Sequence, residues 1–357
     1  DITFTSLLEQ KIEEVTEIKT LKERTARAKG LLIDYDDLGS YLSNIKSFID
    51  PSIKKNKIRV LFNNMNGVGV IGLAPLAKKL NLYQFVIINE DHDAFFGFNL
   101  PNPTKEALIG EFSETVVNQG YVLGLATDRD GDRLGIIDEK GNYVSANEIL
   151  ASIYYYLIKY RGYKGDLVKN CATSVLADLV AESLGYQCHE VDVGFKNITA
   201  GMKQYNALLG GESSGGLTMK GYIYGKDATF AGALFLEMVI KLGKPVSEII
   251  KELKDSVGYN YDFSEDYIRL DVDSQKVSKY MTENLPKLSY QYKEVNIFNN
   301  NIKFLFENRQ WLLLRLSGTE PAFRVFGEFE DSNTLKTLTK ELKEYIENVQ
   351  NIIENEN

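Results

Sequence analysis

The stretch Ala126-Thr127-Asp128-Arg129-Asp130-Gly131-Asp132-Arg133 places three carboxylates at alternate positions within five residues. Carboxylates this close repel one another, so a cation is expected to compensate their charge. Hard divalent ions such as Mg²⁺ and Ca²⁺ take oxygen ligands of this kind. The apolar residues 121–125 and 134–137 on either side predict two short buried strands. The stretch is therefore predicted to be a metal site on a tight turn between two strands.

Two other interpretations of the acidic stretch stay open. The three aspartates and Glu139 match the ligand positions of the EF-hand calcium loop. The sixth position of that loop is a glycine that makes its sharp turn, whereas this chain has Arg133 there. An EF-hand also needs a helix on each side, where this sequence predicts strands. The remaining interpretation is an acidic turn that is merely solvated.

Strands and helices alternate on both sides of the acidic stretch. The pattern predicts, before it, strands over residues 58–62 and 85–88 and helices over 73–80 and 104–118. After it, the pattern predicts strands over 167–170 and 187–191 and helices over 147–160, 174–184, 197–204 and 229–241. This alternation is typical of layered α/β domains with a mainly parallel sheet.

The character of the chain changes near residue 259. Short strands are predicted over 267–272, 302–306, 311–316 and 323–328, framed by helices over 274–284 and 332–351. The predicted fold class is α/β, with two consecutive layered α/β domains followed by a smaller α+β C-terminal domain. The predicted boundaries are 1–36 for a first segment with an amphipathic helix from residue 6 to about 23, then 37–145, 146–258 and 259–357.

The composition indicates a soluble globular protein with more than one domain. The chain has 357 residues, of which 44% are hydrophobic and 25% charged. Its net charge of −9, with both signs interspersed, argues against nucleic acid or an anionic membrane as the main partner. The two cysteines, Cys171 and Cys188, fit a reducing cytoplasm. Residues 230–240 are too short an apolar stretch to span a bilayer, and no signal peptide is evident.

A glycine-rich turn follows the first strand. Gly67-Val68-Gly69-Val70-Ile71-Gly72 matches G-x-G-x-x-G, and Glu90 and Asp91 follow about 20 residues later, as in a dinucleotide-binding fingerprint. Four residues separate the strand from the first glycine, however, and Pro75 falls in the first turn of the helix. A tight strand-to-helix turn is the favoured interpretation, and an NAD-dependent oxidoreductase is kept as a lesser hypothesis.

The run Gly210-Gly211-Glu212-Ser213-Ser214-Gly215-Gly216 combines one carboxylate and two hydroxyls between glycines. Glycines let a ligand approach the backbone closely. A carboxylate beside a hydroxyl can accept from and donate to neighbouring sugar hydroxyls at once. The loop therefore favours a polyol ligand, with a plain flexible loop as the alternative.

A third loop, residues 315–324, reads R-L-S-G-T-E-P-A-F-R. A Ser-Gly-Thr turn at the end of a strand exposes N–H and O–H groups that can form an anion-binding nest. Arg315 and Arg324 flank the turn and can make bidentate contacts to a phosphate. A surface turn whose arginines pair with Glu320 or Glu328 is the alternative. Together the three loops predict a phosphosugar held across a cleft.

In their order and spacing, the three loops resemble those of the α-D-phosphohexomutases, the phosphoglucomutase/phosphomannomutase superfamily. Residues 127–133 are similar to the family's metal loop, D-x-D-x-D-R, and residues 211–216 to its sugar-recognition loop, G-E-x-S-G. Residues 315–324 resemble its phosphate loop, R-x-S-G-T-E-P-x-x-R. Residues 193–196 and 226–227 match further segments of the family's third domain.

The resemblance implies a Mg²⁺-dependent mutase that interconverts glucose or mannose 1-phosphate and 6-phosphate through a phosphoserine and a bisphosphosugar. It implies Asp128, Asp130 and Asp132 as the Mg²⁺ ligands, with Arg133 in a supporting role. The implied substrate ligands are Glu212 and Ser214 for the sugar hydroxyls, Arg315, Ser317, Gly318, Thr319 and Arg324 for the phosphate, and Lys169 and Lys196 on the sugar-phosphate side.

The family's first domain carries its reactive serine in a T-A-S-H-N-P-type motif, and this sequence contains none. The two histidines, His92 and His189, do not follow a serine. The resemblance thus implies domains two to four, with residues 1–36 as a remnant of domain 1 and linker, and a fragment that is inactive without that missing domain. A non-catalytic module that binds sugar phosphate is the alternative. Ser213 and Asn66 depart from common family residues and leave the hexose open.

Overall fold

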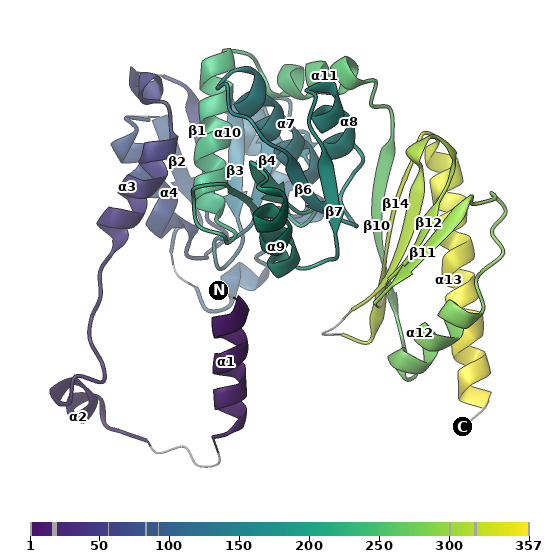
Figure 1. Cartoon of the computed structure of the whole chain (residues 1–357). Helices are drawn as coiled ribbons and strands as arrows, with labels where there is room; N and C mark the ends of the chain where they lie inside the picture. The colour runs from purple at the N-terminus through teal and green to yellow at the C-terminus, as the bar shows by residue number, and fades with distance from the viewer. Residues whose placement is uncertain are drawn as a thin grey trace.

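Three β-sheets follow one another along the chain in the part that the structure describes (Figure 1). The structure is a computed structural model, and it describes residues 2–15, 20–55, 57–82, 84–91, 93–299, 301–317 and 320–355. The first two sheets are mixed: in each of them three neighbouring strands pair in parallel, whereas the remaining strands add antiparallel pairs. The third sheet is antiparallel, and this layout confirms the predicted fold class.

The first sheet has the order β2-β1-β3-β4-β5 and carries the acidic stretch between β3 and β4. Its strands are β1 (Arg59–Asn63), β2 (Gln84–Ile88), β3 (Leu123–Thr127), β4 (Leu134–Asp138) and β5 (Tyr143–Val144). Its helices are α3 (Leu38–Phe48), η1 (Pro51–Lys55), α4 (Gly69–Lys79), η2 (Phe96–Phe98), α5 (Lys105–Leu108) and α6 (Glu111–Asn118). The single helix predicted over 104–118 is two helices, because Gly110 adopts a φ of 113° that an α-helix cannot contain.

The second sheet has the order β7-β6-β8-β9. Its strands are β6 (Leu167–Asn170), β7 (Cys188–Val191), β8 (Leu209–Gly211) and β9 (Leu217–Met219). Its helices are α7 (Ala146–Lys159), α8 (Leu176–Ser183), α9 (Phe195–Tyr205), α10 (Ala228–Leu242) and α11 (Val246–Val257). The sequence analysis omitted α11, although its buried residues Val246, Ile249, Ile250 and Leu253 have helical spacing.

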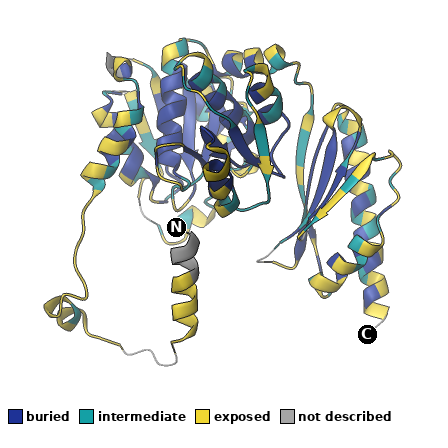
Figure 2. Cartoon of the chain, in the orientation of Figure 1, coloured by how far each residue is buried: buried dark blue, intermediate teal, exposed yellow. Residues whose placement is uncertain are grey.

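One continuous hydrophobic core joins the first two sheets. Helix α10 lies in its centre, and its residues from Ala228 to Val239 are buried (Figure 2). It approaches α4 closely, because Gly72 lies against Thr229, where an added Cβ would be 2.3 Å from the hydroxyl oxygen. Two sheets that bury their apolar faces on the same helix form one packed body.

The third sheet is antiparallel, with the order β10-β14-β13-β12-β11. Its strands are β10 (Asp262–Arg269), β11 (Glu294–Phe298), β12 (Asn301–Leu305), β13 (Trp311–Leu316) and β14 (Ala322–Phe329). The helices α12 (Ser274–Glu283) and α13 (Ser332–Asn355) pack on it around a separate core, and η3 (Glu307–Arg309) joins two strands. Strand β11 was not predicted, because this half-exposed edge strand lacks a continuous apolar pattern.

A buried carboxylate lies at the junction between the second and third sheets. Glu328 is fully buried and accepts hydrogen bonds from the backbone N–H of Val175 (2.8 Å) and the indole of Trp311 (2.9 Å). The hydroxyls of Tyr259 (2.6 Å) and Ser174 donate to the same side chain. These four donors satisfy the buried carboxylate, which would otherwise be costly to remove from water.

Within the described part of the N-terminal segment, residues 7–15 and 20–37 contribute no buried side chain to a core. Helices α1 (Ile2–Glu13) and α2 (Glu23–Ala28) extend from the α/β body, and residues 7–15 are exposed (Figure 2). The helix predicted from residue 6 to about 23 is wrong at its end, because α1 ends at Glu13 and residues 20–22 are not helical; residues 16–19 lie outside the described residues. Among the described helices, none combines the length and the apolar character that a bilayer crossing requires.

Candidate functional site

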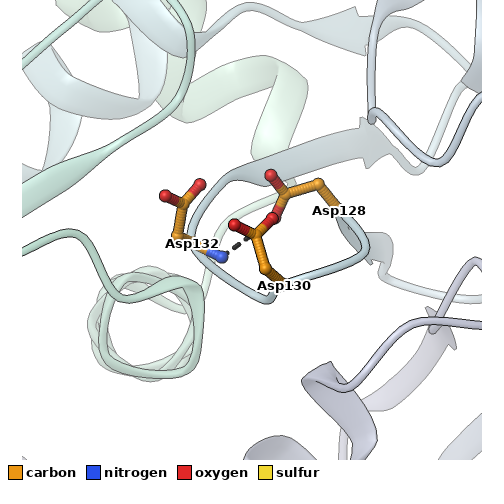
Figure 3. Close-up of side chains that lie close together, drawn as sticks. All are labelled: Asp128, Asp130 and Asp132. Carbon is orange, nitrogen blue, oxygen red and sulfur yellow. Dashed lines mark hydrogen bonds between the residues drawn. The ribbon is translucent and has the colours of Figure 1, made fainter. Parts of the chain in front are cut away.

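The acidic stretch forms the connection between the antiparallel strands β3 and β4. One carboxylate oxygen from each of Asp128, Asp130 and Asp132 lies within 4.8 Å of the others, as Figure 3 shows. The Asp128 Oδ1 accepts the backbone N–H groups of Asp132 and Arg133, both at 2.9 Å, and these bonds hold the turn. The strands on both sides exclude the EF-hand interpretation, which requires helices.

The charges of this loop are incompletely balanced. Burial raises the pKa of Asp128 to about 6, and the neighbouring Asp132 and Asp130 charges act in the same direction. Lys226 Nζ lies 2.6 Å from Asp132, and Arg133 Nε stays 3.7 Å from Asp128. The other oxygen of Asp132 is buried without a hydrogen-bond partner. An orphaned carboxylate oxygen beside two further carboxylates fits a divalent cation.

The glycine-rich turn supports the acidic loop. An added Cβ on Gly67 would lie 2.7 Å from Arg129 Cα, and one on Gly69 would meet the Thr127 hydroxyl at 2.2 Å. The backbone N–H of Val68 donates to the carbonyl of Arg129 at 2.9 Å. The glycines thus let the turn pack against the acidic loop. This contact confirms the structural interpretation and leaves the dinucleotide hypothesis without support.

The loop between β8 and β9 lies directly beside the acidic loop. Ser214 donates to one carboxylate oxygen of the buried Glu212 at 2.8 Å, and Asn170 approaches the other at 3.4 Å. The Gly215 carbonyl accepts the backbone N–H of Leu134, the first residue of β4, at 3.4 Å. The structure therefore fixes the carboxylate–hydroxyl pair close to the three aspartates.

Two arginines face each other on neighbouring strands of the third sheet. Arg315 of β13 and Arg324 of β14 are directly paired in the antiparallel register. Like charges in this position destabilise a sheet unless an anion compensates them. Glu265 lies 3.4 Å from Arg324, and burial raises the pKa of this carboxyl. This one carboxylate is shared by the two arginines. Ser317 directly follows β13. Gly318 and Thr319 lie outside the described residues.

A cleft of about 670 Å³ connects these elements. Its lining brings together Arg133, Ser213, Ser214 and Arg324 with Asn147, Tyr143, Lys254 and Glu265. A second hollow of about 310 Å³ contains the three aspartates and Lys226. Arg133 and Asn102 line both, so the two spaces adjoin. Their volumes lie in the range of small-molecule sites, about 300–1,000 Å³.

The structure does not bring every predicted ligand to the cleft. Lys169 is only 2% exposed, and its ammonium group donates to the carbonyls of Thr173 and Ser174 and to Asp178. These three hydrogen bonds are made inside the protein, so the ammonium group has no N–H left for a substrate. Lys196 is exposed in the first turn of α9 and does not line either space.

Two contributions to the site were not predicted from the sequence. Residues 226–227 were noted only as a segment of the third domain, and the structure places Lys226 against Asp132. Glu265 was assigned no role, because this contact with Arg324 joins residues far apart in the chain.

Two sequence models match the α/β units. The phosphoglucomutase/phosphomannomutase α/β/α domain II matches residues 39–141, and domain III of the same family matches residues 145–256. A phosphoglucomutase/phosphomannomutase of Thermococcus kodakarensis is 30% identical over 326 residues, 90% of this chain and 69% of that protein. The chain belongs to the phosphoglucomutase/phosphomannomutase family.

The chain is also similar to a phosphoglucosamine mutase in sequence and to a solved structure of this family in fold. A phosphoglucosamine mutase of Nautilia profundicola is 27% identical over 354 residues, 96% of this chain and 74% of that protein. A phosphoglucomutase/phosphomannomutase family protein from Burkholderia thailandensis, with a solved structure, has a TM-score of 0.71 at 20% identity. This chain spans 65% of the length of that structure, and the match concerns the fold alone.

Proposed function

We propose that the chain binds a hexose phosphate in the cleft and takes part in phosphohexomutase chemistry, with glucose and mannose phosphates as the substrates. The observation that carries this proposal is the opposite unbalanced charge of two cleft elements. One element has three clustered carboxylates and the other has two arginines opposite each other. A sugar phosphate with a divalent cation supplies both missing charges.

The fit of the acidic loop to Mg²⁺ rests on its donor set. Asp128, Asp130 and Asp132 offer only oxygens, which Mg²⁺ prefers, and the Asp132 oxygen that accepts no hydrogen bond and lies 3.8 Å from Arg133 Nε gives the cation a ready ligand. Asp128 would hold the turn through its two backbone bonds while it contributes its other oxygen. A bound Mg²⁺ would neutralise the charge of a transferring phosphoryl group.

The other residues have separable roles in this proposal. Arg133 lines both spaces and would contact the phosphate on the side of the acidic loop. Glu212 would accept from a sugar hydroxyl, and Ser214, which it orients, would donate to the neighbouring one.

The arginines would bind the non-reacting phosphate. Arg315 and Arg324 provide guanidinium donors from one face of the sheet, and Ser317, Gly318 and Thr319 would complete the anion site. Lys196 is kept as a candidate that would need to reach the cleft from α9. Lys169 is withdrawn, because its ammonium group is already bonded inside the protein.

Isothermal titration calorimetry with glucose 6-phosphate in the presence of Mg²⁺ tests the proposal. We expect binding of glucose 6-phosphate, mannose 6-phosphate and glucose 1-phosphate, and none of unphosphorylated glucose. Equal binding of glucose, or saturable binding of NAD⁺ in the same cleft, would contradict the proposal.

A mutase assay separates catalysis from binding alone. The sequence contains no T-A-S-H-N-P-type motif, so no serine of this chain is assigned as the phosphoryl carrier. We expect the purified chain to show no turnover of glucose 1-phosphate with a glucose 1,6-bisphosphate primer. Robust turnover would overturn this expectation and assign the carrier to a residue of this chain. The cytoplasmic location expected from the two unpaired cysteines stays a prediction.

A further inference from the structure

A third space, a cavity of about 240 Å³, lies between the C-terminal half of α7, the end of α10 and α11. It uses none of the residues of the cleft. Asn147 at the start of α7 lines the cleft, whereas Tyr160 just after the end of α7 lines this cavity. At a rise of about 1.5 Å per residue, these two ends lie about 20 Å apart.

The floor of the cavity is apolar and its wall is aromatic. Met238 and Leu253 are buried beneath it. The rings of Tyr156 and Tyr160 are stacked, with centroids 6.1 Å apart and an angle of 23° between planes. Tyr160 is 54% exposed, so its ring can take another flat ring. Because a cavity of about 150 Å³ holds benzene, this larger one has room for two fused rings.

The mouth of the cavity carries a cation without a carboxylate partner. Lys159 donates to the hydroxyl of Tyr155, and its Nζ lies 4.7 Å from the centroid of that ring and 5.9 Å from that of Tyr160. Within the described ranges of the chain, no carboxylate forms an ion pair with Lys159. Lys244 on the same rim is paired with Glu252, whose carboxylate can also accept an N–H.

We propose that this cavity binds a purine nucleoside monophosphate. The purine would stack on Tyr160 above the apolar floor, its exocyclic amine would donate to Glu252, and its phosphate would pair with Lys159. The match rests on three features that occur together: a space with an apolar floor and room for two rings, the half-exposed ring of Tyr160 beside it, and a lysine that forms no ion pair within the described residues. The site is separate from the hexose phosphate cleft and does not depend on the function proposed for it.

Calorimetric titration of the full chain with adenosine 5′-monophosphate tests the site. We expect saturable binding that excess glucose 6-phosphate does not displace. Tyr160→Ala should weaken it about tenfold, within the range measured for base–aromatic stacking. Lys159→Gln should weaken binding of the monophosphate and leave that of adenosine unchanged. Tyr35→Ala, which removes a tyrosine that is 81% exposed elsewhere, should have no effect.

Both test residues are exposed, so their variants are expected to keep the fold, and a thermal unfolding curve checks this. Absence of binding at millimolar adenosine monophosphate would overturn the proposal. The same holds if ribose 5-phosphate binds as tightly, if glucose 6-phosphate competes, or if folded Tyr160→Ala binds like the unaltered chain.

Discussion

The two junctions between consecutive sheets are built in different ways. Between the first and second sheets, α10 is buried on all sides, and one apolar core runs through both units. Between the second and third sheets, the centre is Glu328 with its four hydrogen-bond donors, beside a small apolar cluster that includes Trp311. The first junction is a shared core, whereas the second joins two separate cores through buried hydrogen bonds and a small apolar cluster.

This difference divides the cleft into a fixed side and an attached side. The acidic loop and the Glu212 loop belong to the shared core and are hydrogen-bonded to each other. Arg324 of the third sheet lines the cleft across the polar junction, and Arg315 lies opposite it on β13. Motion between the two cores would change the distance between the phosphate-binding arginines and the metal loop, whereas the metal and sugar loops would keep their spacing. The following predictions test this division, from the largest expected effect to the smallest.

Removal of the junction carboxylate gives the largest effect. Glu328→Ala leaves the indole N–H of Trp311 and the hydroxyl of Tyr259 buried without an acceptor. We expect the free energy of unfolding to fall by about 3–5 kcal/mol, as for other broken buried charge networks. Chemical denaturation followed by tryptophan fluorescence measures this, since Trp311 is the only tryptophan. The exposed Glu330→Ala is the control, and equal effects of both substitutions would contradict a polar junction.

Removal of one arginine tests the attached side. Arg324→Ala should weaken binding of glucose 6-phosphate by about 1–3 kcal/mol, the range for a charge-assisted hydrogen bond. The affinity of the acidic loop for Mn²⁺ should stay unchanged, because that loop belongs to the other core. Calorimetry measures both constants. An unchanged affinity for the sugar phosphate would remove Arg324 from the site.

The pH dependence of metal binding tests the fixed side. The pKa of Asp128 is raised to about 6, so the metal-free loop holds a proton at pH 5 that it lacks at pH 7.5. A carboxylate ligand must lose this proton, so Mn²⁺ affinity should fall about tenfold for each pH unit below 6. Titrations at pH 5.0, 6.0 and 7.5 check the sign and the slope. Asp128→Asn should flatten the profile, and a metal affinity that rises on acidification would rule out this ligand.

Removal of the lysine beside Asp132 gives the smallest effect. Lys226→Met removes a cation 2.6 Å from a proposed metal ligand and should tighten Mn²⁺ binding. The pair is partly exposed, so the gain is about 0.2–1 kcal/mol, up to roughly fivefold. Lys220→Met, at an exposed position after β9, is the matched control. Weaker metal binding by Lys226→Met would show that this lysine supports the loop instead of competing with the metal.

The sequence predicted those parts of the site that depend on neighbouring residues. The strands around the acidic loop, the carboxylate–hydroxyl pair Glu212 and Ser214, and the two arginines at strand ends were all local patterns. The order and spacing of the three loops along the chain resembled those of the family, and this resemblance implied that the loops form one site.

The parts that could not be predicted depend on contacts between distant segments. Lys226 with Asp132, and Arg324 with Glu265, join residues that no local pattern relates. Lys169 was misplaced because a lysine is expected at a surface, whereas here protein carbonyls and Asp178 compensate its buried charge. Glu328 was considered only as a possible partner of the arginines, and its role at the junction required the fold.

A crystal structure of the chain grown with Mn²⁺ and glucose 6-phosphate tests the central claim most directly. We predict an anomalous manganese peak between Asp128, Asp130 and Asp132, with the phosphate of the sugar against Arg315 and Arg324. Glu212 and Ser214 should contact adjacent sugar hydroxyls. Manganese outside the three carboxylates, or a sugar phosphate bound away from both arginines, would contradict the account.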